Sequence, residues 1–313
     1  MDGCVCMAEG ISRFEAGRRL DRRQFLESCL AAWAGLAGGA LLSSGCSRKP
    51  SAGATYPVDM IPGITRRAGN VFLFENHNVS HLVWHALGIR HATVVHVDTH
   101  DDFRHVDSGK LGRIQRLLRE GDYAQLYAKS DLEFSFQQKI RSSDMLFDLG
   151  NYLFPCLQDK TISRIYWVVP EKQMDPALAG RLAQHFQRVF KVESPVTARV
   201  IKEGLIEFDL FEKCLTVSTL DSLPQMPGGS LLDLDVDFFA FPRALVDDHL
   251  PGTLIWDVPE VCRRLTERVP DPAVTTICVD PATLPTAAGT PHKVTLVTSP
   301  MRPLHKFVPV MIT

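Results

Sequence analysis

The chain has little net charge, no CxxC motif and no hydrophobic run long enough to span a membrane. Its 34 Lys and Arg against 36 Asp and Glu give a formal net charge of −2, so there is no electrostatic case for nucleic acid as a partner. The absence of paired-cysteine spacing among the eight cysteines excludes zinc-finger and redox motifs and argues against a disulfide framework. What remains, 313 residues of which 45% are hydrophobic, suits a soluble globular protein of one large domain or two small ones.

Residues 1–46 have the organisation of an export signal. Arg22 and Arg23 open the sequence RRQFL, and an apolar run rich in Gly and Ala follows at 29–42. A charged region before a short apolar region is typical of a signal peptide. The RRxFL order resembles the twin-arginine (Tat) signal, which a translocase reads as an address. An ordinary amphipathic N-terminal helix is the alternative, although a run so rich in Gly and Ala would pack poorly.

The apolar run ends at Cys46, and a polar segment follows. Gly45 and Cys46 after a Leu/Ser stretch resemble a bacterial lipobox, in which the cysteine becomes the lipidated N-terminus of the mature chain. Residues 47–57 are then expected to form a flexible tether. Residues 58–313 are expected to form the folded domain, at the extracytoplasmic face of a bacterial membrane and held there through the lipid anchor alone.

Short apolar runs rich in Val, Ile, Leu and aromatic residues predict strands, and several of them are too apolar to alternate, as expected of strands covered on both faces. These runs occupy residues 70–76, 92–98, 164–170, 230–237 and 273–279. Segments 78–88, 176–190 and 258–269 carry apolar residues at helical spacing and predict helices. Alternating β and α units predict an α/β fold, with a mostly parallel central sheet between helices in three α/β/α layers.

Acidic and histidine side chains follow several of the predicted strands. They gather at 75–77, 98–102 and 233–237. Ligands of such sheets bind at the carboxyl ends of the strands. Three acidic groups at one sheet edge would repel one another unless cations neutralised them.

The segment VHVDTHDDF places Asp98, His100 and Asp102 at D-x-H-x-D spacing. If the extended backbone persists, these three side chains face the same side. Imidazole with carboxylate suits Mn, Fe or Zn, and the shortage of sulfur argues against a soft-metal site. The alternative is a solvated acidic loop with a helix N-cap at Asp101 or Asp102.

The segment LLDLDVDFF places Asp233, Asp235 and Asp237 at alternate positions of a buried-looking strand. Burying unpaired carboxylates is costly, which favours metal binding over the alternative of an exposed edge strand. His77 lies at a strand-to-helix turn, where it can reach the sheet edge. His81 and His85 are interpreted as structural residues.

The motifs ENH…W, VHVDTHDDF, GNYLFP, YWVVP and LDLDVDFF together resemble the UPF0489 family, within the arginase/ureohydrolase–deacetylase superfamily, over about residues 70–300. The resemblance implies an arginase-like fold and two divalent cations, with Mn²⁺ favoured and Zn²⁺ possible. The ligands that it implies are His77, Asp98, His100, Asp102, Asp235 and Asp237. Asp233 with Asp235 is the alternative register of the last pair.

The resemblance covers the metal platform but not the substrate loops of arginase or agmatinase, because FENHN replaces GGDHS and the His-Gly loop is absent. Arginase or agmatinase activity is therefore unsupported. Because two bridged cations would lower the pKa of a shared water, the leading function is a binuclear hydrolase of a C–N bond, amide or guanidine-like, in a small-molecule substrate. Glu75, Asp102 and His105 are the candidates for proton transfer.

Three other interpretations of the function stay open. DTHDD also resembles the start of membrane dipeptidases, which are zinc peptidases built on barrels. A metallophosphoesterase is another enzymatic alternative. The non-enzymatic alternative is a tethered binding lipoprotein whose metal is structural.

Overall fold

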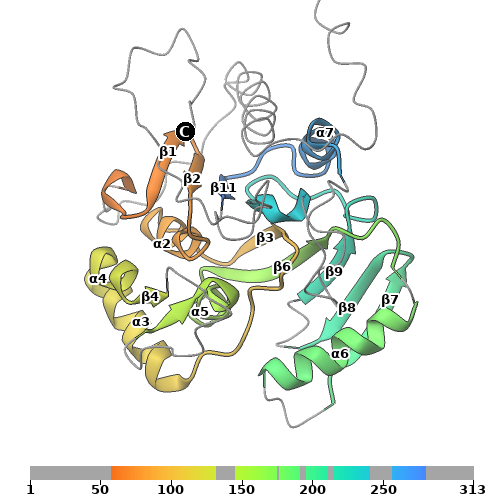
Figure 1. Cartoon of the computed structure of the whole chain (residues 1–313), viewed down its shortest axis with the longest axis horizontal. Coiled ribbons are helices and arrows are strands. Elements are labelled where there is room, and N and C mark those ends of the chain that lie inside the picture. Colours follow the sequence, from red (N-terminus) through yellow and green to blue (C-terminus); the bar gives the residue numbers. More distant parts are fainter. Residues whose placement is uncertain are drawn as a thin grey trace, which may run out of the picture.

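The computed structural model describes residues 58–131, 145–174, 176–190, 195–210, 215–239 and 256–279 (Figure 1). The expected export signal with Arg22, Arg23 and Cys46, and the expected tether at 47–57, lie outside these residues. Within the described ranges, no helix is both long enough and apolar enough to cross a membrane.

A nine-stranded sheet in the order β1-β2-β11-β10-β3-β6-β9-β8-β7 forms the centre of the structure (Figure 1). Its strands are β1 (Ile64–Ala68), β2 (Val71–Phe74), β3 (Ala92–Val97), β6 (Ile162–Val169), β7 (Thr197–Lys202), β8 (Leu205–Asp209), β9 (Leu215–Thr219), β10 (Leu231–Asp235) and β11 (Val274–Cys278). The strands from β2 to β9 in this order pair in parallel. Antiparallel pairs join β1 to β2, β8 to β9 and β7 to β8.

Helices cover both faces of this sheet. They are α2 (Val79–Ala86), α3 (Ser108–Glu120), α4 (Tyr123–Ala128), α5 (Leu153–Gln158), α6 (Pro176–Phe190) and α7 (Val258–Arg268), with 3-10 turns at Val58–Met60, Leu149–Asn151 and Val236–Phe239. One hydrophobic core contains residues of α2 to α6, and a second contains residues of α7. Figure 1 shows α7 on one side of the sheet and α3, α5 and α6 on the other. The predicted three-layer α/β/α fold is confirmed.

The two cores divide the strand residues by alternation. In β3, Val94 packs in the core under α2 to α6, whereas Val95 and Val97 pack in the core under α7. The same alternation assigns Leu231 to the first core and Leu232 to the second. His96 and Asp233 are therefore on the α2–α6 face, the same face as Val94 and Leu231.

The strand order distinguishes this fold from the barrel of a membrane dipeptidase, which was one of the alternatives. The described strands form a sheet with two distinct ends, β1 and β7, rather than the closed barrel that a membrane dipeptidase would require. A minor two-stranded sheet pairs β4 (Ser130–Asp131) with β5 (Phe147–Asp148).

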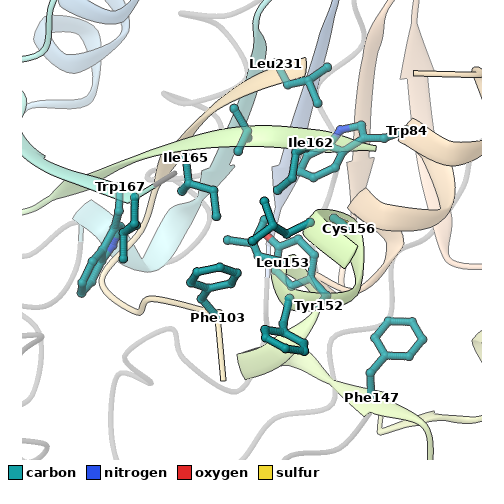
Figure 2. Packing of buried hydrophobic residues seen from close by; sticks show 14 of the residues in the cluster. Trp84, Phe103, Phe147, Tyr152, Leu153, Cys156, Ile162, Ile165, Trp167 and Leu231 are labelled. Carbon is teal, nitrogen blue, oxygen red and sulfur yellow. The ribbon is translucent and has the colours of Figure 1, made fainter. Parts of the chain in front are cut away.

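Tyr152, just before α5, brings a hydroxyl group into an apolar environment. Figure 2 shows its ring among buried side chains that include Leu153, Phe103 and Ile165. Because the side chain is fully buried, its hydroxyl needs a partner inside the protein. That partner belongs to the polar cluster described below.

Candidate metal centre

His77 is held at the turn between β2 and α2. The backbone N–H of Ser80 donates to the carbonyl of His77, and that of Val79 donates to the carbonyl of Asn76. The Asn76 side chain accepts a hydrogen bond from the backbone N–H of Asn78 (3.1 Å). The turn therefore fixes His77, which is 1% exposed, at the carboxyl end of β2.

Strand register lines up polar residues from three neighbouring strands. Asp233 of β10 pairs with His96 of β3 and with Thr276 of β11. Two residues further on, Asp235 pairs with Cys278. Side chains two residues apart share one face, so polar groups occupy two successive rows on the face that α2 and α5 cover.

Three carboxylates converge on one nitrogen of His77. The Nδ1 atom lies 3.3 Å from Asp98 Oδ2, 3.1 Å from Asp102 Oδ2 and 3.3 Å from Asp235 Oδ2. A single ring nitrogen can donate at most one hydrogen, so it cannot satisfy three acceptors. Both ring nitrogens of His77 and Asp98 Oδ2 are in fact buried without a hydrogen-bond partner. These buried polar atoms match the ligand shell of a cation.

A second group shares Asp98 with the first. His100 Nδ1 lies 2.9 Å from Asp237 Oδ2 and 3.6 Å from Asp98 Oδ1. Asp237 Oδ2 is buried without a hydrogen-bond partner, whereas its Oδ1 accepts from the backbone N–H of Thr99. The side chain of His100 is 50% exposed, so this group is the one that reaches solvent.

The loop after β3 is shaped to bring Asp102 back to His77. Asp102 has φ 46°, a left-handed conformation that is uncommon outside glycine. Its carbonyl accepts a hydrogen bond from the N–H of Leu153, and the N-cap of α3 at Asp107 ends the loop. Strained backbone of this kind concentrates at functional sites.

Asp233 is fully buried, and both of its oxygens face donors. One of its oxygens accepts from Ser80 Oγ (2.7 Å) and Thr276 Oγ1 (2.5 Å). The other accepts from the hydroxyl of Tyr152 and lies 3.0 Å from His96 Nδ1. The Nε2 atom of His77 is 3.2 Å from this same oxygen. Asp233 therefore contacts the cluster, but both of its oxygens are already used by protein donors and neither is left to bind a cation.

The cluster contains more carboxylates than imidazoles, and their mutual repulsion shifts the pKa values. Burial, followed by repulsion from Asp98, raises the pKa of Asp102 and of Asp237, and burial raises that of Asp235. Tyr152, followed by Asp233, outweighs burial and raises the pKa of His77, and the Asp237 carboxylate likewise outweighs burial and raises the pKa of His100. Burial opposes ionisation of Asp233, but the charge of His77 outweighs it and lowers the pKa of Asp233. Divalent cations would supply the missing positive charge.

The candidates for proton transfer lie in different places. Asp102 is part of the cluster. In the described structure, no hydrogen bond or ion pair joins Glu75 or His105 to it. His105 is exposed and packs its ring on Phe154, 5.2 Å between centroids, and Glu75 acts electrostatically on Tyr127.

The interpretation of His81 and His85 as structural agrees with their contacts. His81 Nε2 is 2.7 Å from Asp159 Oδ2, and His85 Nδ1 is 2.9 Å from the hydroxyl of Tyr123.

The structure adds residues to the site that the sequence analysis did not select. His96, Tyr152 and Cys278 lie beside the predicted ligands, and Cys278 brings a sulfur atom to a site for which the sequence indicated a shortage of sulfur. His96 could have been found, because it precedes Asp98 by two residues and so shares its face. Tyr152 and Cys278 come from distant segments that only the fold brings close.

A further pair joins α6 to the loop that carries the predicted ligands. His185 Nε2 on α6 is 2.6 Å from Asp101 Oδ2, and Asp101 stands between two predicted ligands in sequence. Asp101 is mostly buried and His185 is 39% exposed. A carboxylate thus orients a solvent-accessible imidazole next to the loop that carries the ligands.

Comparison with known proteins adds no assignment, since no family model matches the chain and no curated protein matches it significantly. The site itself is informative. Buried His and Asp side chains form overlapping groups whose ligand atoms lie within 4.8 Å of one another. Such a donor set, with buried oxygens and nitrogens that lack partners, can hold divalent metal ions.

Proposed function

We propose that the cluster is a binuclear metal centre with Asp98 as the shared ligand. His77 Nδ1, Asp98, Asp102 and Asp235 would hold one cation, and Asp98, His100 and Asp237 the other. The observation that carries this proposal is the convergence of three buried carboxylate oxygens on His77 Nδ1, at 3.1 to 3.3 Å. The resemblance to ureohydrolases favours Mn²⁺, with Zn²⁺ as the next choice.

The hydrogen bonds of Asp233 favour Asp235 and Asp237 as the ligands from β10 and the turn after it. Both oxygens of Asp233 already accept from protein donors, whereas Asp237 Oδ2 has none. A carboxylate behind a ligating histidine fixes the ring and its tautomer. In this proposal Asp233 Oδ2 faces His77 Nε2 at 3.2 Å, behind the ring, and Nδ1 is left for the cation.

The reaction that this platform supports best is hydrolysis of a C–N bond, amide or guanidine-like, in a small molecule. Two divalent cations, when bound, supply an activated water and polarise the carbon that it attacks. The buried carboxylates hold the cations in place and keep bulk water out. His100, half-exposed, lies where a substrate would enter. The order of motifs in the sequence and their meeting at one sheet edge support this reaction class.

Proton transfer is better assigned to His185 than to Glu75 or His105. Its Nε2 is oriented by Asp101 at 2.6 Å, which leaves Nδ1 to take up or release a proton. An imidazole held by a carboxylate is a common general acid or base. Asp102 is already used as a metal ligand in this scheme.

Export and lipid anchoring complete the proposal. Support comes from the RRQFL sequence, the short apolar run after it and the Gly45–Cys46 pair. The protein would then act at the extracytoplasmic face of the membrane, after passage through the twin-arginine translocase.

Elemental analysis of the purified protein tests the metal centre. We expect close to two divalent ions per chain in the wild type. Asp98→Asn should lose both, because Asp98 serves both groups, and Asp237→Asn should keep about one. Asp59→Asn is the matched control, since Asp59 is exposed and pairs with Arg67 rather than with any proposed ligand. A wild type without metal, whose melting temperature ignores chelator and added Mn²⁺ or Zn²⁺, would refute the centre.

A tethered binding protein with a structural metal remains the second candidate, because most of the ligands are buried. The two candidates differ in whether a coordination position stays open. Azide or fluoride, which bind at open metal positions, should perturb the spectrum of a Co²⁺-substituted catalytic site and leave a closed structural site unchanged.

A further inference from the structure

Cys278 ends β11 at the same sheet edge as the predicted ligands. Its strand pairs in parallel with β10 on one side and β2 on the other, with Asp235 and Phe74 as the direct partners of Cys278. The side chain is fully buried and belongs to the core under α2 to α6. Cys278 is thus next to a proposed ligand, on the face where the cluster lies.

The sulfur atom is within ligand distance of the cluster. Sγ of Cys278, a ring nitrogen of His77 and a carboxylate oxygen of Asp235 all lie within 4.8 Å of one another. Atoms that bind one tetrahedral zinc ion at about 2.0–2.3 Å are about 3–4 Å apart. The limit of 4.8 Å includes this range.

The neighbouring atoms indicate independently that a ligand belongs here. Both ring nitrogens of His77 are buried without a hydrogen-bond partner, as is Asp98 Oδ2. A buried imidazole without a partner is costly, and a cation at Nδ1 would relieve that cost. The cysteine, the histidine and the carboxylate together have the chemistry of a borderline-soft metal site.

We infer that Cys278 is a sulfur ligand of the His77-centred position and sets its metal preference. This inference rests on the proposed binuclear centre. Thiolate favours Zn²⁺ and Co²⁺ over Mn²⁺, which prefers oxygen ligands. The group of Asp98, His100 and Asp237 contains nitrogen and oxygen donors alone, so it stays open to Mn²⁺. The two positions therefore differ in metal, with zinc at His77 and a harder ion at His100.

Cobalt spectroscopy tests the inference without any knowledge of the substrate. The full-length protein is loaded with Co²⁺ and its near-ultraviolet absorption is recorded, because a bond between sulfur and Co²⁺ gives a strong charge-transfer band there. Wild type should show the band and Cys278→Ser should lose it. Cys262→Ser is the control, because Cys262 is equally buried but lies on α7 in the other core.

Competition between metals gives the second readout. Cys278→Ser should lower the affinity for Zn²⁺ relative to Mn²⁺ by at least about tenfold, since loss of even an outer-shell partner costs 10–100-fold. Bound Co²⁺ without a sulfur band in wild type, or a band that survives in Cys278→Ser, overturns the role of Cys278 and leaves the metal centre intact. Failure of wild type to bind Co²⁺, Zn²⁺ or Mn²⁺ overturns the centre as well. The wild-type spectrum decides even if the serine variant does not fold.

Discussion

Replacing Asp233 by Asn tests how the cluster is built. The change keeps the shape of the side chain and removes its charge and one acceptor. Ser80 and Thr276 donate to one oxygen of Asp233, and Tyr152 donates to the other, which also faces His96. The NH₂ group of Asn would replace one of the two carboxylate oxygens. In the wild type the groups around both oxygens donate hydrogen bonds, so these hydrogen bonds must rearrange or break.

Two magnitudes follow from these contacts. Loss of the carboxylate behind His77 should weaken metal binding 10–100-fold, or about 1.4–2.7 kcal/mol, which is the usual effect of removing such a partner. A buried donor left without its acceptor costs about 1–3 kcal/mol, so the metal-free protein should also lose stability by about that amount. The six ligands of the proposed binuclear centre remain, as does Cys278, and two ions should still bind at saturating metal.

Calorimetric titration with Zn²⁺ and with Mn²⁺, beside thermal unfolding with and without chelator, measures both effects. Asp235→Asn is the comparison, because removing a ligand should lower the number of bound ions and not only the affinity. If Asp233→Asn lowers the number of ions as Asp235→Asn does, Asp233 is itself a ligand and the alternative register is right. Affinity unchanged from wild type would refute the positioning role of Asp233.

Two further predictions concern stability and export. Burial, with the nearby charges of His81 and Arg90, lowers the pKa of His85 to about 4 from an ordinary 6.5, so the unfolded chain binds the proton more readily between these values. The free energy of unfolding should therefore fall as pH drops from 6.5 toward 4. Denaturant titrations at several pH values should show a smaller decrease for His85→Gln than for wild type. An equal decrease in the two proteins would exclude His85 as the cause. Replacing both residues of the 22–23 arginine pair by Lys should retain precursor in the cytoplasm, and Cys46→Ala should release the mature protein from membranes. Immunoblots of cell fractions measure both effects, and replacement of the arginine pair at 18–19 by Lys is the control. Unchanged fractionation of both variants would refute the export signal.

Hydrophobic runs were enough to predict the centre of the sheet. Every strand predicted from such a run is present, because strands buried on both faces must be apolar throughout. Outer strands give a weaker signal. Most of β7 is exposed, and β9 is buried but carries Thr216, Ser218 and Thr219, so neither reads as an apolar run. The antiparallel edge that they form with β8 was accordingly not predicted.

Local sequence motifs likewise predicted most residues of the cluster. His100 and Asp102 belong to the same short segment as Asp98, so their meeting depends on one loop. The contribution of Cys278 depends on the pairing of β11 with β10, which places it opposite Asp235. Such register is a property of the whole sheet, and nothing in the residues around Cys278 reveals it.

The order of strands also bears on how the protein is made. β2 and β3 come early in the chain, yet β11 and β10 lie between them. Until residues 231–278 emerge, the strand before His77 and the strand before Asp98 each keep one unpaired edge, and such edges invite aggregation. The proposed cation site also lacks Asp235 until then. Under the proposed function, the centre is therefore complete only after residues up to 278 have been synthesised, which sets the earliest point at which it can capture metal.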